Sequence, residues 1–319
     1  MQVVLKKYKP DWTYIKCDYD SLRETVTKYL TTDKANTFHL GEPTLRFSIV
    51  ETGQKYRLLL VNWHHAILDA TSWELVQQDF HDVYHGEPRV SLYPFAKFVE
   101  EIYSKTSDDV AKEKYYWLNK FAQLSRAFIP RLGAPQESGP TRNQIARSIQ
   151  LPVERISQCA QQLHVTAFTL IKAAWAILLR EYTQSNDVVF GYVLNGRNGD
   201  LEGVSTIVGP CINTLPSRTL CDNQTTIAEL LLQIHESYTF ALSYQQSSLR
   251  DIQEWVGVSP LFDSIINYRV NSSTQKEHSK TPKDKIDDEG EFKLVPIQGN
   301  EATEVSHGVV FYENICITL

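Results

Sequence analysis

The pattern of hydrophobic and polar residues in the first half of the chain predicts a buried strand followed by helices. Residues 56–63 form an apolar run, and its length and dense Leu and Val content are typical of a buried strand. The run ends at His64 and His65. From residue 72 to Gly86 apolar residues recur three and four positions apart, which predicts a helix with an apolar stripe of Trp73, Val76, Phe80, Val83 and Tyr84. Two further helical patterns cover residues 94–105 and 108–124.

The second half of the chain combines strand and helix patterns. Strands are expected at residues 145–151, 187–194 and 264–270 and near the C-terminus, with a further segment at 207–218. Two helices follow residue 151, and the second is predicted to be buried on most sides, with an inner stripe of Phe168, Ile171, Trp175, Leu178 and Tyr182. A helix over residues 225–244 begins with a capping box of Thr226 and Glu229. Its predicted inner face consists of Ile227, Leu231, Ile234 and Tyr238.

A short segment rich in proline and glycine divides the chain. Residues 129–141 carry three prolines and two glycines with little apolar content, which is typical of a connection between domains. We therefore expect an N-terminal domain over residues 1–128 and a C-terminal domain over residues 142–319. Residues 271–291 contain one aliphatic side chain among four lysines and six acids, which predicts a solvated loop.

The composition is that of a globular protein with about two folding units. Of the 319 residues, 42% are hydrophobic and 22% are charged, which excludes a disordered chain. The formal net charge of -6 has the wrong sign for binding nucleic acid or anionic lipid, so the expected partners are small molecules or proteins. The longest apolar stretch, residues 173–179, is too short for the ~18 residues that a membrane span requires.

The cysteines and the N-terminus both predict a cytoplasmic location. The five cysteines are odd in number and form no C-x-x-C pair, as expected of reduced thiols. The N-terminal segment lacks the apolar core and the small-residue cleavage site of a secretory signal.

Candidate chemistry begins at the predicted end of the first buried strand. His64 and His65 lie there, and Asp69 follows His65 four residues later. Side chains at a strand end are accessible while their backbone stays rigid, and a nearby acid can hold a histidine in one tautomer for proton transfer. Considered alone, however, this pattern is more typical of a hydrogen-bonded turn.

Other catalytic and cofactor signatures are missing. His81 and His85 have the four-residue spacing of zinc ligands, but they lie on the flank of the apolar stripe and no Glu follows His81, so we predict no metal site. The chain contains no serine hydrolase elbow, no P-loop and no dinucleotide-binding glycine motif. ATP and NAD are therefore excluded as expected cofactors.

Four groups of residues resemble motifs of the condensation domains of nonribosomal peptide synthetases, in the order of that family. Residues 62–70, NWHHAILDA, resemble the H-H-x-x-x-D-G active-site motif. Residues 187–191 together with 195–197 resemble the motif D-V-V-F-G-x-x-x-S-G-R. Residues 208–218 resemble V-G-x-F-x-N-T-x-P-x-R. Residues 249–252 resemble P-L-x-x-I, and residues 261–264 resemble the L-F-D-T that follows it. Together they extend over about 200 residues, which makes the resemblance far more specific than the histidine pair.

The resemblance implies an α/β chloramphenicol-acetyltransferase-like fold with two lobes. Each lobe would be an open sheet with helices, and the active site would lie in the tunnel between them. The implied activity is that of an acyltransferase, which joins a donor acyl thioester to the amine of an acceptor aminoacyl thioester. Both substrates would arrive on the phosphopantetheine arms of carrier domains, no cofactor would be bound directly, and an adenylation domain would be a neighbour.

The resemblance also assigns roles to individual residues. His65 would act as the base or orient the amine, and His64 would be structural. Asp69 would support the loop by pairing with an arginine, for which Arg197 is the first candidate and Arg218 the second. Trp73 and Asn213 would line the tunnel, with a capped strand end as the alternative for Asn213.

Several features depart from the family pattern. Ala70 replaces a glycine, Asn195 a serine and Cys211 an aromatic residue. The family's arginine-rich N-terminal motif and its final strands and helix have no counterpart, so we expect these 319 residues alone to be a poor catalyst with exposed apolar surface. A cyclising or ester-forming relative and a non-catalytic carrier-docking module remain as alternatives. The sequence does not specify substrates or oligomeric state.

Overall fold

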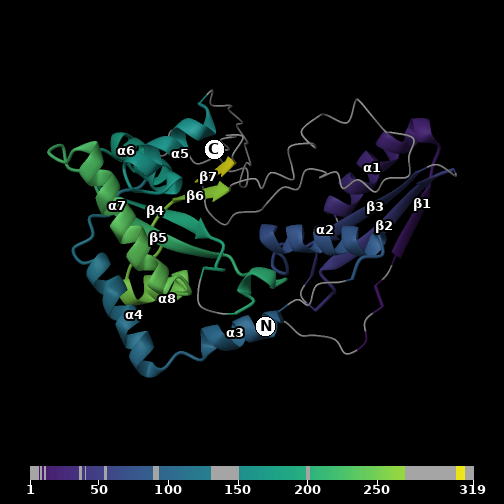
Figure 1. Cartoon of the computed structure of the whole chain (residues 1–319), viewed down its shortest axis with the longest axis horizontal. Coiled ribbons are helices and arrows are strands. Elements are labelled where there is room, and N and C mark those ends of the chain that lie inside the picture. Colours follow the sequence, from purple (N-terminus) through teal and green to yellow (C-terminus); the bar gives the residue numbers. More distant parts are fainter. Residues whose placement is uncertain are drawn as a thin grey trace. The chain divides into compact units, whose positions relative to one another are not determined.

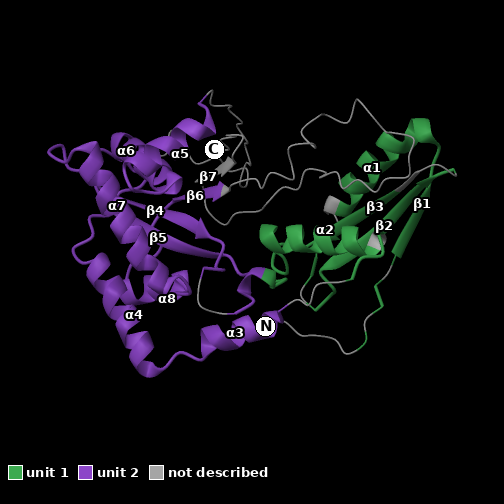
Figure 2. Ribbon diagram, in the orientation of Figure 1, with its two compact units in different colours: residues 1–92, 206–210 green, residues 93–205, 211–319 purple. Residues whose placement is uncertain are grey.

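The computed structural model describes residues 7, 9–10, 12–35, 38–39, 41–53, 56–88, 93–130, 151–198, 202–269 and 307–312. These residues form helices and two separate sheets, which confirms the predicted α/β class. The chain forms two compact units, shown in Figure 2. Unit 1 comprises Met1–Leu92 with Thr206–Pro210, and unit 2 comprises Tyr93–Ser205 with Cys211–Leu319.

Unit 1 contains a three-stranded sheet in the order β1-β2-β3 (Figure 1). Its elements are β1 (Trp12–Lys16), the short helix η1 (Tyr19–Ser21), α1 (Leu22–Ala35), β2 (Leu45–Thr52), β3 (Tyr56–Trp63) and α2 (Ala70–Tyr84). β2 runs parallel to β1 and antiparallel to β3, which confirms the predicted strand at 56–63. A small core forms where α1 packs on the sheet through Val26, Val50 and Leu60.

Unit 2 contains a four-stranded sheet in the order β5-β4-β6-β7. Its strands are β4 (Asp187–Leu194), β5 (Asn213–Leu220), β6 (Ser264–Arg269) and β7 (His307–Tyr312). Its helices are α3 (Phe95–Tyr103), α4 (Ser107–Lys120), α5 (Val153–Gln162), α6 (Ala167–Thr183), α7 (Ile227–Ala241) and α8 (Leu249–Val256), with η3 at Leu242–Tyr244; η2 spans Val204–Thr206. The predicted strands at 187–194 and 264–270 and the helices around them are confirmed. Residues 145–150 and 271–291, predicted as a strand and a loop, lie outside the described residues.

The core of unit 2 forms between α6, α7 and the sheet, and Figure 1 shows these two helices beside β4. The predicted stripe of α6 was wrong at its second half, because Leu178 and Tyr182 are 42% and 61% exposed. The buried face consists instead of Phe168, Thr169, Lys172, Ala173, Trp175, Ala176 and Leu179. The predicted face of α7 was likewise wrong at Ile227, which is exposed directly after the confirmed Thr226–Glu229 capping box.

The helices α3 and α4 lie in unit 2, although the sequence pattern placed them in the first domain. The reason is that Trp117 of α4 is fully buried and donates a hydrogen bond from Nε1 to Ser247 Oγ at 2.8 Å. Phe121, directly after α4, is buried in the same core. The division between the two units therefore falls at Leu92–Tyr93. Most of the predicted linker, residues 131–141, lies outside the described residues.

Across the described ranges, no single helix is long and apolar enough to cross a membrane. The helices α5 and α6 meet the length and composition test only when taken together, and they are bent by 95° at the break between them.

The core of unit 2 encloses a lysine. Lys172 is 1% exposed, and its Nζ lies 3.8 Å from the ring centroid of Tyr192 and 4.7 Å from that of Tyr238. Burial lowers the pKa of Lys172 well below its ordinary value, and repulsion from Lys120 adds to this effect. The rings favour the ammonium form by about 2 kcal/mol, but desolvating an ion costs several kcal/mol, so desolvation dominates.

We predict that Lys172→Met stabilises the protein increasingly as the pH falls. Unfolded chains protonate lysine below about pH 10.4, whereas the native core resists protonation until a lower pH. Because the unfolded state then binds more protons, native stability falls with falling pH, by up to about 1.4 kcal/mol per pH unit. Urea unfolding between pH 7 and 10 should show a gain for Lys172→Met that vanishes above this window. The exposed Lys114→Met is the control, and a pH-independent gain at Lys172 would contradict the prediction.

Candidate active site

The loop between β3 and α2 in unit 1 carries the two histidines. β3 ends at Trp63, and the backbone N–H of His64 donates to the carbonyl of Thr44 at 2.9 Å, which extends the pairing of the sheet by one bond. The N–H of Ile67 donates back to the carbonyl of His64 at 3.1 Å. These bonds form a tight turn in which both histidines are exposed.

The ring of His65 is held by the backbone of its own loop. Its Nδ1 lies 2.8 Å from the carbonyl oxygen of Leu68. A carbonyl oxygen only accepts hydrogen bonds, so Nδ1 must carry the proton. In the neutral ring the lone pair that can accept a proton is therefore on Nε2. This contact therefore fixes the tautomer of the neutral His65 ring.

His64 has the opposite arrangement. Its Nδ1 lies 3.1 Å from the backbone N–H of Ala66 and accepts a hydrogen bond from it. Its ring also meets the ring of Phe38 edge-on at a centroid distance of 6.2 Å. His64 thus uses Nδ1 to hold the turn, which favours the structural role expected for it.

Asp69 begins the helix that follows the histidine loop. It is 2% exposed, and its Oδ1 accepts hydrogen bonds from the backbone N of Ser72 at 2.8 Å and from Ser72 Oγ at 2.7 Å. This is the N-cap arrangement, in which a carboxylate satisfies an N–H of the first helical turn. Ala70 is the first residue of α2, where the backbone has a negative φ, so alanine fits in place of the family's glycine without strain.

Three contacts fix the strand and the helix on either side of this loop within unit 1. Trp73 of α2 stacks on Trp63 at the end of β3, with ring centroids 4.2 Å apart. Asn62 donates to Asp33 Oδ2 at 2.6 Å, and Arg46 pairs with Asp33 Oδ1 at 3.1 Å. Asp33 of α1 therefore fixes the last residues of β3, a role that no pattern in the sequence indicates.

Two of the predicted site residues, Arg197 and Asn213, belong to unit 2. Arg197 is 8% exposed, and its backbone N–H and its Nη1 donate to the side chain and the carbonyl of Asn195 at 3.1 Å and 3.3 Å. The expected pairing of Arg197 with Asp69 stays a prediction.

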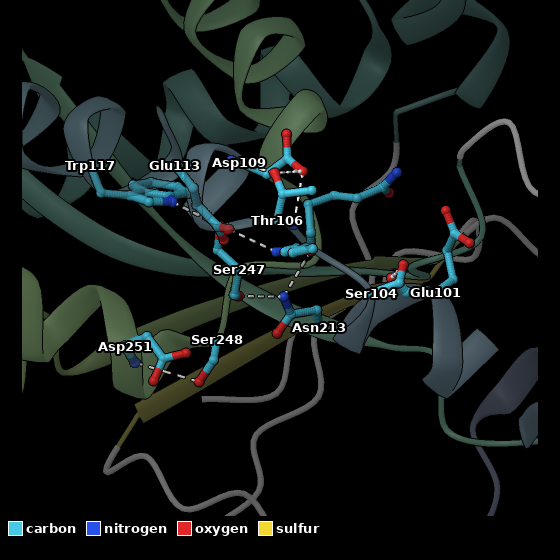
Figure 3. A network of polar contacts seen from close by, with 12 residues as sticks. Glu101, Ser104, Thr106, Asp109, Glu113, Trp117, Asn213, Ser247, Ser248 and Asp251 are labelled. Carbon is cyan, nitrogen blue, oxygen red and sulfur yellow. Dashed lines mark hydrogen bonds and ion pairs between the residues drawn. The ribbon is translucent and has the colours of Figure 1, made fainter. Parts of the chain in front are cut away.

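Asn213 ties the start of β5 to the loop before α8, as Figure 3 shows for its contact with Ser247. Its Nδ2 donates to the carbonyls of Gln245 and Ser247, each at 2.7 Å, and its Oδ1 accepts from the N–H of Thr214 at 2.9 Å. Both amide protons are used in these bonds. This favours the capped strand end over a tunnel-lining role for Asn213.

Arg218 was the second candidate partner of Asp69, and the structure shows it bound by Asp187 within unit 2. Its Nε and Nη2 donate to the two carboxylate oxygens of Asp187, each at 2.8 Å. Its guanidinium also donates to the backbone carbonyls of Lys120, Ala122 and Gln123. The ion pair joins β5 to the first residue of β4 and so links two of the motifs found in the sequence, while the bonds to the carbonyls attach the end of α4 and the residues just after it.

Two glycines of the motif around β4 are required by close packing. A side chain at Gly191 would overlap the ring of Phe262. Gly196 has a φ of +67°, and a Cβ there would overlap the carbonyl oxygen of Cys211. The separate motifs of unit 2 thus contact each other directly.

The structure brings together His64, His65, Asp69 and Trp73 in one loop and helix of unit 1. The sequence interpretation missed Ser72, whose buried hydroxyl contacts Asp69 and Gly209, because Gly209 is 137 residues away. Within the described part of the chain, no group of three or more His, Cys, Asp or Glu side chains is placed to hold a metal ion.

The chain belongs to the condensation-domain family, which matches residues 1–304. It is 27% identical over 280 residues to nonribosomal peptide synthetase 8 of Aspergillus fumigatus, covering 86% of this chain and 3% of that protein. It is 28% identical over 292 residues to nonribosomal peptide synthetase 5 of Gibberella zeae, covering 90% of this chain and 2% of that protein. The chain therefore spans only a small part of the length of the curated relatives it matches.

Among solved structures, the starter condensation domain of rhizomide synthetase aligns with a TM-score of 0.64 at 17% identity, covering 82% of this chain and 62% of that one. This similarity shows the fold and confirms the predicted chloramphenicol-acetyltransferase-like class.

Proposed function

We propose that this chain catalyses condensation between two carrier-bound thioesters in nonribosomal peptide synthesis, with His65 as the residue that handles the proton. The observation that supports this role is the bond from His65 Nδ1 to the carbonyl of Leu68, which leaves Nε2 as the basic nitrogen. Membership of the condensation-domain family supports the reaction class.

In the proposed reaction the amine of the acceptor attacks the carbonyl carbon of the donor thioester. A C–N bond forms, the C–S bond breaks, and the thiolate of the donor's phosphopantetheine arm leaves. An amine with a pKa near 8 is largely protonated at neutral pH, and the neutral imidazole of His65 would accept or position its proton, which ends on the departing thiolate. Holding both thioesters next to each other would contribute much of the rate.

The other residues of the site would support His65. His64 holds the turn and Asp69 caps α2, while Arg197 is the proposed partner of Asp69. Trp73 follows the histidine loop on α2 and is proposed to line the substrate path, whereas Asn213 is proposed to hold the start of β5.

The proposed partners are upstream and downstream carrier domains, with an adenylation domain as neighbour. The phosphopantetheine arms belong to the carriers, so the chain itself would bind no cofactor directly. We propose a cytoplasmic location. The thiols of Cys17, Cys159 and Cys221, which form no disulfide in the described part of the chain, are compatible with it.

The test is the mass of the carrier-bound product. Full-length protein is mixed with a donor carrier loaded with an acyl group and an acceptor carrier loaded with an amino acid. The expected result is an acceptor carrier heavier by the acyl group. When hydroxylamine cleaves the carrier thioester, the released product should keep the acyl group on the amine of the amino acid, because an amide resists this reagent. A hydroxyl acceptor tests the ester-forming alternative. Loaded carriers that remain unchanged in mass with either acceptor would contradict the proposal and favour a docking role only.

A further inference from the structure

Ser72 lies in the first turn of α2, and its side chain is fully buried. Its hydroxyl contacts three polar groups at once. Oγ lies 2.7 Å from Asp69 Oδ1 and 2.7 Å from the carbonyl oxygen of Gly209, and it accepts a hydrogen bond from the N–H of Gly209 at 2.9 Å. All three distances are in the range of good hydrogen bonds.

The donor and acceptor capacity of the hydroxyl determines which of these contacts it can donate to and which it accepts. A serine hydroxyl has one proton to donate and two lone pairs that accept. The N–H of Gly209 occupies an acceptor site, and the single proton is shared between the Asp69 carboxylate and the Gly209 carbonyl. One buried hydroxyl thus joins a helix cap to both backbone groups of a residue 137 positions away.

Gly209 belongs to a short segment that lies, along the sequence, between two stretches of unit 2. Residues Thr206–Pro210 are grouped with unit 1, although the chain before and after them belongs to unit 2 (Figure 2). Ile207 and Gly209 of this segment are both buried. The bonds to Ser72 therefore attach the segment to the start of α2.

The same hydroxyl is connected to His65 through two residues of the histidine loop. Ser72 holds the carboxylate of Asp69, and Asp69 directly follows Leu68. The carbonyl of Leu68 in turn accepts the bond from His65 Nδ1. A shift of Asp69 would move this carbonyl and release the imidazole.

We propose that Ser72 is a positioning residue for His65. Its hydroxyl, held by Gly209, fixes Asp69 and the Leu68 carbonyl, and so keeps the His65 ring in the tautomer with the proton on Nδ1. The catalytic part of this inference rests on the proposed function, whereas the tautomer does not.

The test compares Ser72→Ala with Ser48→Ala in the full-length protein. Ser48 is the matched control, because it is also a buried serine of unit 1, and its Oγ bonds to Tyr29 OH at 2.5 Å, away from the histidine loop. The first readout is the tautomer of His65 by 15N NMR of histidine-labelled protein. The second is the rate of amide formation at saturating carriers. Ser72→Cys, which keeps the volume and weakens the hydrogen bonds, provides the same readouts if Ser72→Ala does not fold.

We expect Ser72→Ala to move His65 toward the tautomer with the proton on Nε2 and to lower kcat by about 10- to 100-fold, with KM for the carriers little changed. Ser48→Ala should lower the melting temperature without either effect. An unchanged His65 tautomer in Ser72→Ala and Ser72→Cys would overturn the inference. If the unmodified protein forms no amide, the proposed function is wrong. The His65 tautomer in Ser72→Ala and Ser72→Cys then decides by itself whether Ser72 positions the ring.

Discussion

Replacing His65 by alanine is expected to lower the rate of amide formation by about 10²- to 10⁴-fold, the usual contribution of a general base. The expectation follows from the bond between His65 Nδ1 and the Leu68 carbonyl, which directs the basic Nε2 away from the backbone that holds the ring. The rate is measured from the mass of the carrier-bound product. Because His65 is exposed, the melting temperature should change little.

The control for this experiment is His81→Ala. His81 is also an exposed histidine of unit 1, and it lies near the end of α2. Its removal should leave the rate unchanged. An equal rate for His65→Ala and the parent protein would show that His65 handles no proton in the reaction.

Replacing Arg218 by alanine is expected to lower the free energy of unfolding by about 3–5 kcal/mol. The Arg218 and Asp187 side chains are only 13% and 10% exposed, and Asp187 also accepts a hydrogen bond from the N–H of Ser125 at 2.9 Å. Removing the guanidinium leaves the Asp187 carboxylate without its ion-pair partner. Three backbone carbonyls, at the end of α4 and just after it, also lose the group that donates hydrogen bonds to them. Urea unfolding at neutral pH measures the loss.

Arg250→Ala is the matched control for the loss of an arginine. Arg250 is exposed on α8, so its removal should change the free energy of unfolding by less than about 0.5 kcal/mol. In the double variant with Asp187→Ala, the two losses should not add, because each single change already breaks the same pair. Additive losses would mean that the two side chains contribute independently.

Hydrophobic periodicity predicted the strands β3 and β4 and failed where polar residues occupy buried positions, as in β2, the central strand of its sheet. β3 and β4 were found because their apolar runs are continuous. β2 was missed because its buried face carries Ser48, Val50 and Thr52, two of which are polar.

The same cause displaced the predicted stripe of α6. Thr169 and Lys172 are buried there, although both residue types are usually exposed. The apolar pattern therefore pointed to Leu178 and Tyr182 on the exposed side. A hydropathy pattern cannot anticipate that Lys172 is enclosed by aromatic rings from other elements.

The sequence predicted those residues of the candidate site whose contacts are with residues nearby in the chain. The motif located His65 and the cap residue Asp69, both of which act through bonds to residues within three positions. Ser72 and Asp33 act through residues that are distant in sequence, so their roles required coordinates. Local sequence likewise does not reveal that Arg218, the second candidate partner of Asp69, is bound by Asp187.

The tautomer of His65 tests the central claim most directly, and 15N NMR of histidine-labelled protein measures it above the pKa of the imidazole. The spectrum of His65→Ala identifies the resonances. Free histidine prefers the proton on Nε2, so the two outcomes are distinct. We predict that His65 carries the proton on Nδ1, as its 2.8 Å bond to the Leu68 carbonyl requires. A neutral His65 with the proton mainly on Nε2 would contradict the assignment of Nε2 as the group that accepts the proton of the attacking amine.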